Sequence, residues 1–415
     1  MLLNEIEKSM LAGEMGEPRR QALEHQQKVG RFFDAADMVE IAQAHIMADT
    51  EALGSANVEY LEKVASYPEE DRHVAIPTIT DPRGADLKQY TIVRQDEAFI
   101  DLERRTIAAF EALGVMMTDT CINYQLFMPP VQGQNLAFGD TGVCIYSNSV
   151  LGARTNYEGG PSALAAALTG RTPRYGFHLD EHRRGTTLFE IQDQPQNLTD
   201  WGALGGIIGR QMRSYFEVPV VDGIEKAPTS DALKHFGAAL ASFGSTPLFH
   251  MIGITPEAPD LKSVFDSAPP QPIGIKQTSI EKFYDDYGAH DDRLDLVVFA
   301  APQLSLVELQ SLAEMLDGQK VNTDTSLLVC TAPAFKAEAD RMGFTKKITG
   351  SGALLLEGVC FYQMHAREMG LANKWQRLMT NSAKLTNIIS GYGYEPVLGN
   401  MEACVTSAIA GRITR

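Results

Sequence analysis

The residues of this chain that could do chemistry are most concentrated in one run, Ser147 to Pro173, which reads SNSVLGARTNYEGGPSALAAALTGRTP. Hydroxyl, amide and guanidinium groups crowd there around glycines, just before the helix-prone segment SALAAAL. Because polar groups without partners are costly to bury, we expect this run to lie on a surface. Free N–H groups at a helix start and arginine side chains both favour anions, so the run predicts a site for a small anionic ligand.

The cysteines are the second candidate for chemistry. They are odd in number and widely spaced: Cys121, Cys144, Cys330, Cys360 and Cys404. No pair has the spacing of a zinc site or a ferredoxin-type cluster, and spacing alone favours small buried residues. We expect reduced thiols or metal ligands rather than disulfides, and only Cys121 and Cys360 follow elements at whose ends ligands usually bind.

Two shorter motifs each leave two interpretations open. TNSAKL, residues 380–385, could cap a helix through a hydroxyl, or could grip a carboxylate with hydroxyls and the ammonium of Lys384. In HLDEH, His178 and His182 are four residues apart and could bind a metal from one helix face. That motif is not H-E-x-x-H, and its charged neighbours favour a solvated surface instead.

The charge balance excludes some partners. The 53 acidic residues outnumber the 36 lysines and arginines, which gives a net charge of -17 and argues against nucleic acid and anionic membranes. The positive charge for an anionic substrate must therefore be local, and the candidates are Arg154, Arg171, Arg174, His178 and Lys384. The N-terminus lacks the pattern of a signal peptide and no apolar run approaches a membrane span, so we expect a cytoplasmic protein.

The elements that must position these groups predict an α/β protein of more than one unit. A chain of 415 residues is long enough for two or three domains. We expect an N-terminal helical region over 1–75, a substrate-binding α/β subdomain over 76–290, and a C-terminal α/β subdomain over 291–415. From Asp295 onward, buried strands alternate with amphipathic helices, which predicts βαβ units and a parallel sheet that binds ligands at its carboxyl edge.

Shorter patterns predict the elements upstream. We expect helices with breaks near residues 16–18 and 54–55, a strand over 74–80, a helix over 97–113 and a long loop over 128–142. Glycines at positions 202, 205, 206 and 209 share one face of a helix. Close packing of that helix is favoured over a phosphate-binding loop, because no Lys-Ser/Thr follows.

The run Ser147–Pro173 closely resembles a signature of the large, catalytic subunit of aconitase X, a branch of the aconitase superfamily. Further similar segments cover most of the chain: MLAGEMGEPRRQAL and IAQAHI, which resemble the opening helices of that family, PTITDPRGAD, LDLVVFAAPQLSLVEL and TNSAK. The resemblance implies an aconitase-like fold of several subdomains with parallel βαβ sheets, lacking the swivel domain.

The resemblance also implies an activity. Family members are hydro-lyases that dehydrate small hydroxy carboxylates with an iron–sulfur cluster. The first expectation for this chain is cis-3-hydroxy-L-proline dehydratase, and the alternative is a dehydratase of the mevalonate 5-phosphate type. A separate small swivel subunit is implied as partner, and the catalytic base could lie on that subunit or be a hydroxyl of this chain.

The working hypothesis assigns roles to particular residues. Ser149 and Lys384 are the expected catalytic residues, and the expected ligands of an iron–sulfur cluster or iron are Cys121, Cys360 and Cys404. Arg154 and Arg171 would hold the substrate carboxylate together with Lys384. The other expected substrate-binding residues are Ser147, Asn148, Thr155, Asn156, Ser162, Asn381 and Ser382.

The chain departs from the family's pattern where the chemistry is expected. Ala300-Ala301-Pro302-Gln303 stands where the family shows Gly-Cys-Pro-His, so an expected thiol is missing. Residues 122–123, 358–359 and 385–388 also differ from the pattern, whereas Cys121 and Cys360 match it. Cys404 or Cys144 could replace the missing thiol. Two alternatives stay open: an enzyme with an altered metal centre, or a metal-free binding or regulatory subunit.

Overall fold

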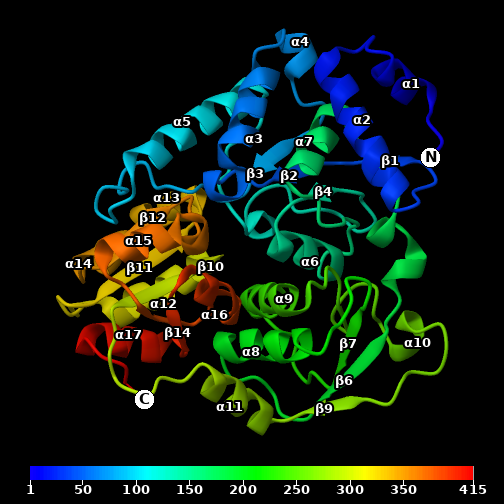
Figure 1. Cartoon of the computed structure of the whole chain (residues 1–415). Helices are drawn as coiled ribbons and strands as arrows, with labels where there is room; N and C mark the ends of the chain where they lie inside the picture. The colour runs from blue at the N-terminus through cyan, green and yellow to red at the C-terminus, as the bar shows by residue number, and fades with distance from the viewer. Residues whose placement is uncertain (415) are drawn as a thin grey trace.

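Three units meet at the centre of the molecule (Figure 1). The computed structural model describes residues 1–414. The N-terminal unit, drawn in blue through cyan to bluish green, lies toward the top of the view, the middle unit is green, and the C-terminal unit is yellow to red. Every sheet of three or more strands is parallel throughout, so the predicted α/β class with parallel sheets is confirmed within the described residues.

The N-terminal unit contains a three-stranded sheet in the order β3-β2-β4 and an antiparallel pair, β1 with β5. Its strands are β1 (Met38–Glu40), β2 (Ala44–Ile46), β3 (Thr78–Thr80), β4 (Ala137–Phe138) and β5 (Arg171–Pro173). Its helices are α1 (Glu5–Leu11), α2 (Glu17–Phe32), α3 (Thr50–Ala65), α4 (Glu69–Arg72), α5 (Glu97–Ala112), α6 (Thr141–Ser149) and α7 (Gly160–Thr169).

The expectation that residues 1–75 are helical was wrong for the segment that holds β1 and β2. These strands have only three residues each, too few to show an alternating pattern, and their pairing partners are distant in the sequence. The predicted breaks are confirmed: α2 begins after Gly16, and Gly54 interrupts α3 with φ of 65°. The expected helix over 97–113 is also confirmed as α5.

The middle unit has a four-stranded sheet in the order β8-β7-β6-β9. Its elements are β6 (Thr187–Ile191), α8 (Leu198–Gly209), β7 (Pro219–Asp222), α9 (Ser230–Gly244), β8 (His250–Met251), α10 (Leu261–Val264), β9 (Ile273–Ile275) and α11 (Gln277–Asp286). The predicted glycine face packs α8 closely against α9: a Cβ at Gly205 would lie 2.2 Å from the carbonyl oxygen of Phe236. Close packing is thus confirmed for this helix.

The C-terminal unit has a five-stranded sheet in the order β12-β11-β10-β13-β14. Its strands are β10 (Leu296–Leu304), β11 (Ser326–Thr331), β12 (Leu354–Glu357), β13 (Arg377–Thr380) and β14 (Glu395–Leu398). Its helices are α12 (Leu306–Leu316), α13 (Pro333–Met342), α14 (Phe344–Gly350), α15 (Ala366–Asn373), α16 (Ala383–Ile389) and α17 (Met401–Ala410). Since β10 is buried along its whole length, its sequence shows a continuous apolar run, and the predicted βαβ units are confirmed.

Buried contacts join the middle and C-terminal units. Lys234 and His235 on α9 both pair with Glu308 on α12, and the His235 Nε2 to Glu308 Oε1 distance is 2.7 Å. Asn387 on α16 donates to the carbonyl of Ser242 on α9 at 3.0 Å.

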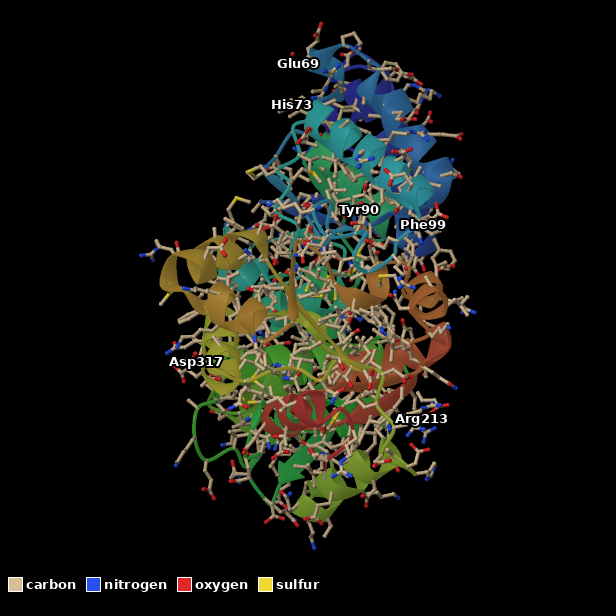
Figure 2. All side chains as sticks on the ribbon, turned by 90° about the vertical axis from the view of Figure 1, so that its left-hand side faces the viewer. Glu69, His73, Tyr90, Phe99, Arg213 and Asp317 are labelled. Atoms are coloured by element: carbon tan, nitrogen blue, oxygen red, sulfur yellow. The ribbon has the colours of Figure 1, made fainter. Side chains whose placement is uncertain are left out.

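Charged side chains such as Glu69 and Asp317 lie at the periphery (Figure 2). Among residues 1–414, no helix is long and apolar enough to cross a membrane.

Candidate active site

The carboxyl edges of two parallel sheets supply the polar groups of the candidate active site. On the N-terminal side, Asp81 follows β3, Asp49 follows β2 and Asp140 follows β4, and these three strands are neighbours in one sheet. On the C-terminal side, Cys360 follows β12 and Lys384 follows β13. Carboxyl ends of parallel strands are the usual place for a ligand, and here groups from two such edges interact.

Cys121 and Cys360 form a buried pair of thiols. Both are nearly inaccessible to solvent. A hydrogen bond from the Cys360 thiol is the largest cause that lowers the pKa of Cys121, while burial and the same neighbour raise the pKa of Cys360 well above its ordinary value. The backbone N–H of Gln303 also donates to the Cys121 sulfur at 3.5 Å. Cys121 is therefore the more acidic thiol of the pair.

Lys384 brings a buried positive charge to this pair. Its helix α16 begins at the N-cap Ser382, whose hydroxyl accepts from the N–H of Leu385 at 3.0 Å. The Lys384 ammonium lies 3.3 Å from the Asp140 carboxylate. Burial alone would lower the pKa of Lys384, but Asp140 and the two thiols raise it above its ordinary value, so the ammonium stays charged. TNSAKL thus provides both a helix cap and a charge in the site.

Asp81 and Asp140 occupy opposite protonation states. Burial, together with repulsion by Asp140 and Cys121, raises the pKa of Asp81 well above its ordinary value, which keeps it a neutral acid. Burial also acts on Asp140, but Lys384 and the N–H of Val143 outweigh it, so its pKa is lowered. Two neighbouring carboxyl groups with separated pKa values are a common arrangement for acid–base catalysis.

Several buried polar atoms around these groups have no hydrogen-bond partner among the described residues. They are both side-chain polar atoms of Asn123, Asp81 Oδ1, His45 Nδ1, Gln303 Oε1 and Gln363 Oε1. Most buried polar groups in proteins are paired, so a concentration of unpaired ones indicates a place for a ligand or ordered water. His45 keeps its other ring nitrogen on the carbonyl of Thr120 at 3.0 Å, which leaves Nδ1 as a free acceptor.

Asp49 extends the site into a row of buried carboxyl groups. The amide of Gln363 bridges it to Asp81, donating to Asp49 at 3.1 Å and to Asp81 at 2.7 Å. Burial raises the pKa of Asp49 from 3.8 to about 7, although the N–H of Ala52 acts in the opposite direction. Between these two pH values the unfolded chain has released this proton while the folded chain keeps it, so stability falls as pH rises.

Asp49→Asn is expected to remove this pH dependence. Asparagine can still cap α3 through its oxygen, and its amide can donate to the unpaired Oε1 of Gln363. The difference between the free energies of unfolding of the variant and the wild type should therefore increase in favour of the variant, by up to about 4 kcal/mol, as the pH rises from 4 to 7. Urea denaturation at several pH values measures this, with the exposed Asp324→Asn as control. Parallel curves for Asp49→Asn and the wild type would contradict the assignment.

The expectation that the run Ser147–Pro173 lies on a surface was wrong for most of its polar residues. Ser147, Asn148, Thr155 and Asn156 are all at most 1% exposed. The two asparagines satisfy the backbone of nearby loops: Asn148 donates to the carbonyls of Thr155 and Pro247, and Asn156 to that of Tyr175. The Ser147 hydroxyl has no hydrogen-bond partner among the described residues. Short polar side chains that bond to nearby loop backbone can be buried at little cost.

The other residues predicted for the site lie apart from the thiol pair or serve the fold. Arg171 pairs with Glu7 and Glu40 between α1 and β1, and Ser162 contacts His25. Ser149 accepts from the N–H of Phe249 at 2.9 Å. Asn381 is buried beside Ser382, whose hydroxyl donates to the carbonyl of Ala301. Cys404 is buried in the core beneath β10, and its thiol lies 3.5 Å from the carbonyl of Gly399.

Arg154 and the histidines lie in a different part of the molecule. Arg154 contacts the carbonyl of His178 at 3.0 Å and pairs with Asp180. His178 is buried rather than solvated, and it and His182 lie in two separate short 3-10 turns, not on one helix face. No group of three or more metal-binding side chains is placed to hold an ion anywhere in residues 1–414.

The sequence reasoning missed the aspartates and His45. IAQAHI, expected to be helical, contains β2 and His45, while PTITDPRGAD contains β3 and Asp81. The signal that could have found them is the rule already applied to the C-terminal sheet: a carboxylate directly after a buried strand is a candidate site residue. Recognising β2 and β4 as strands would have been the necessary step.

Comparison with known proteins identifies the family. Models of the first, third and second domains of aconitase X match residues 1–181, 294–410 and 185–285. The phosphomevalonate dehydratase large subunit of Methanothermobacter thermautotrophicus is 33% identical over 94% of this chain and 94% of its own length. The chain belongs to the aconitase X family. The predicted resemblance is confirmed, and the chain is a hydro-lyase of the aconitase X type, as expected.

Other members of the family show the same extent of similarity. The phosphomevalonate dehydratase large subunit of Methanocaldococcus jannaschii is 32% identical over 97% of this chain and 98% of its own length. A cis-3-hydroxy-L-proline dehydratase from Pseudomonas aeruginosa is 29% identical over 99% of this chain but only 70% of its own length. The crystal structure of aconitase X from Thermococcus kodakaraensis, described as the holo-form, has a TM-score of 0.87, with 27% identity over 98% of this chain and all of that one.

The side chains of this aconitase X do not fit a cluster held by three cysteines. Two thiols, Cys121 and Cys360, lie together, but the position expected for the third carries the methyl group of Ala301. Cys330 packs in the same core cluster as Cys360, but no group of three metal-binding side chains is placed to hold an ion within residues 1–414. Cys404 packs in another core cluster, and the Cys144 thiol lies 3.0 Å from the carbonyl of Phe138. The amide nitrogen of Gln303 donates to the carbonyls of Asp119 and Val359, which leaves only Oε1 without a partner.

Proposed function

We propose that this chain dehydrates a phosphorylated hydroxy acid of the mevalonate 5-phosphate class together with a separate small subunit. The observation that carries the proposal is the full-length match to two phosphomevalonate dehydratase large subunits, each covered to 94% or more. The chain covers only 70% of the cis-3-hydroxy-L-proline dehydratase. These matches support the alternative substrate class over cis-3-hydroxy-L-proline, which was the first expectation. "Large subunit" in the names of the relatives supports the separate partner.

The reaction class sets what the site has to do. In both compounds the hydroxyl is on the carbon β to the carboxylate, so elimination breaks one C–H bond and one C–O bond. The proton passes to a base, and the hydroxide leaves as water once it has gained a proton. Negative charge develops on the carboxylate as the C–H bond breaks, so a fixed cation beside it stabilises the transition state.

Lys384 is the residue we assign to the substrate carboxylate. Its ammonium is buried and stays charged, and its only carboxylate partner among the described residues is Asp140, at 3.3 Å. Because it has three N–H donors, it can keep Asp140 and bind the substrate at the same time. Asp140 would then hold the ammonium in place rather than react.

Asp81 is the residue we assign as the acid that protonates the leaving hydroxyl. It is fully buried, its Oδ1 makes no hydrogen bond and lies 3.6 Å from His45 Nε2, and its Oδ2 is fixed by the amide of Gln363 at 2.7 Å. A neutral carboxyl group with one free oxygen can donate a proton at that oxygen. The base that removes the α-proton is left to the small subunit, since Ser149 already accepts a backbone hydrogen bond away from this site.

The assay that tests the proposal compares two substrates on the chain purified with its small subunit without oxygen. The expected result is a kcat/KM for mevalonate 5-phosphate at least about 100-fold above that for cis-3-hydroxy-L-proline, because a phosphate contributes binding energy that the imino acid lacks. Unphosphorylated mevalonate and the chain without its partner are the controls. The reverse preference would favour the hydroxyproline activity, and binding of either compound without turnover would favour a regulatory subunit.

A further inference from the structure

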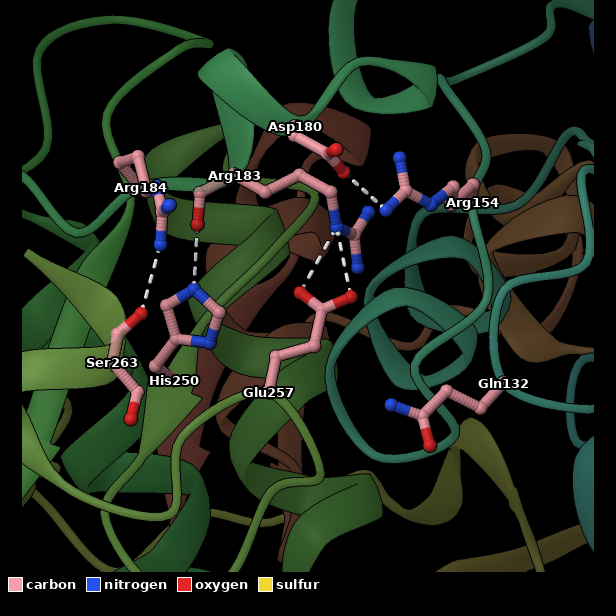
Figure 3. Close-up of a pocket in the computed structure, with 8 residues that line it drawn as sticks. All are labelled: Gln132, Arg154, Asp180, Arg183, Arg184, His250, Glu257 and Ser263. Atoms are coloured by element: carbon pink, nitrogen blue, oxygen red, sulfur yellow. Dashed lines mark hydrogen bonds and ion pairs between the residues drawn. The ribbon is translucent and has the colours of Figure 1, made fainter.

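A second polar cavity lies away from the candidate active site. It has a volume of about 350 Å³, within the roughly 300–1,000 Å³ of small-molecule sites. It is lined by Gln132, Arg154, Asp180, Arg183, Arg184, His250, Glu257 and Ser263 (Figure 3). None of these residues belongs to the two sheet edges that hold the thiols and Lys384. The cavity contains Arg154, an arginine of the run Ser147–Pro173 that lies outside the candidate active site.

Three guanidinium groups face this cavity. Arg183 is almost fully buried and is fixed by Glu257 at 3.0 Å and by the carbonyl of Asn148 at 3.0 Å. Arg154 and Arg184 each donate a hydrogen bond to a backbone carbonyl, those of His178 and Ser263, at 3.0 and 2.8 Å. Each of these two uses only part of its five N–H groups in that way. The cavity therefore presents positive charge on a fixed wall, Arg183, and on two more adaptable side chains.

The carboxylates that pair with the two outer arginines are weakly held. Asp180, the partner of Arg154, has a side chain 81% exposed, and Asp266, the partner of Arg184, has one 72% exposed. Exposed ion pairs contribute little and are replaced at little cost, because water solvates the released carboxylate. A ligand with two negative charges can therefore take both guanidinium groups, while the partly exposed Glu257 stays on the buried Arg183.

His250 forms part of the buried wall of the cavity. It is 2% exposed, and its Nε2 lies 2.7 Å from the carbonyl oxygen of Arg183. A carbonyl can only accept, so Nε2 carries the hydrogen and Nδ1 has a free lone pair. No group among the described residues bonds to Nδ1, and Figure 3 shows it on the side of the ring that faces Glu257. Burial and the charges of Arg183 and Arg184 lower the pKa of His250, so the lone pair is retained.

We propose that this cavity binds a small phosphate monoester that carries a hydroxyl group, at a site separate from catalysis. The phosphoryl oxygens would take the guanidinium groups of Arg154 and Arg184, for which a fork of N–H donors is well suited. The hydroxyl of the ligand would donate to the carboxylate of Glu257, which lines the cavity and is partly exposed. Inorganic phosphate fills only part of 350 Å³, whereas an ester with a few carbon atoms occupies the remainder.

Calorimetric titration with sn-glycerol 3-phosphate tests this proposal on the chain paired with its small subunit. We expect saturable binding that the double variant Arg154→Gln/Arg184→Gln weakens at least about 10-fold, since each change removes charge-assisted hydrogen bonds. Both side chains are partly exposed, so the variant should fold. Arg213→Gln, which removes an exposed arginine outside the cavity (Figure 2), is the matched control and should bind as the wild type does.

A second comparison separates this cavity from the active site. Lys384→Gln, which changes the candidate active site, should leave the binding of glycerol 3-phosphate in place, and glycerol should not compete. Absence of saturable binding by the wild type at millimolar concentration would overturn the proposal. Binding that Lys384→Gln removes and the double arginine variant retains would also overturn it, because the anion would then occupy the catalytic site. Neither result depends on which substrate the enzyme dehydrates.

Discussion

Lys384→Gln is expected to lower kcat/KM for dehydration at least about 1,000-fold. The variant loses the fixed positive charge that opposes charge building up on the substrate carboxylate, and a single such donor in a dry site is worth about 100- to 1,000-fold by itself. Since the whole charge is lost here, the effect should reach the upper end or exceed it. Steady-state kinetics with the small subunit present measures it, with either substrate of the assay above.

Loss of folding must be separated from loss of chemistry in this variant. Removing Lys384 leaves the buried Asp140 carboxylate without its partner, which costs about 3–5 kcal/mol of stability. The double variant Lys384→Gln/Asp140→Asn removes both charges, and asparagine still caps α6 by accepting from Val143. We expect the double variant to regain most of the stability and none of the activity. Activity near that of the wild type in the double variant would show that Lys384 only balances Asp140.

Ala301→Cys is expected to increase iron binding at the thiol pair of Cys121 and Cys360. Ala301 follows strand residues that pack beside Cys360, and two residues later the N–H of Gln303 contacts the Cys121 sulfur. A thiol at this position would be the third donor next to the existing pair. Iron retention against a chelator should rise by more than the about 10- to 100-fold that changes around a metal site typically cause.

Metal analysis decides this second prediction. Iron and acid-labile sulfide per chain, with an absorption spectrum, are measured on wild type and variant after the same reconstitution without oxygen. Ala300→Cys is the matched control, because it adds one buried thiol at the neighbouring position of the same strand. Equal iron in wild type and Ala301→Cys would contradict the prediction, and equal iron in both cysteine variants would show that position does not matter.

The C-terminal half of the site could be predicted from the sequence because its elements are long. The nine-residue strand β10 and the amphipathic helix after it begin a clear strand–helix alternation, and the strand-end rule applied to β12 (Leu354–Glu357) in that alternation led to Cys360. TNSAKL supplied Lys384 directly. The N-terminal half is built from strands of two or three residues, which carry no periodicity and are defined only by pairing across distant segments. Asp140, which follows the unrecognised β4, therefore could not be placed, whereas Asp81 directly follows the strand predicted over 74–80 and the strand-end rule was not applied to it.

The polar run shows a different limit. Its composition indicated a ligand surface, but composition does not tell whether an asparagine satisfies a ligand or the backbone of its own loop. Asn148 and Asn156 do the latter, and only the folded chain reveals which carbonyls they reach. Arg154 kept its expected exposure to solvent, yet it opens into a cavity that the motif gave no means to locate.

The buried ion pairs between α9 and α12 limit which domains of different family members can be combined in one chimaeric chain. Lys234 and His235 belong to the second-domain match and Glu308 to the third-domain match. All three are buried where the two domains meet. A chimaera that took the last third of the chain from a relative without a matching acid would leave the buried Lys234 paired with Asp231 of its own helix, at 3.1 Å, and would remove the acid that pairs with His235. Residues 286–293 thus separate two domains in the sequence, while in the folded molecule the buried ion pairs hold these domains together. Exchange of domains across this boundary succeeds only when the basic residues of α9 and the acid of α12 are taken from the same parent.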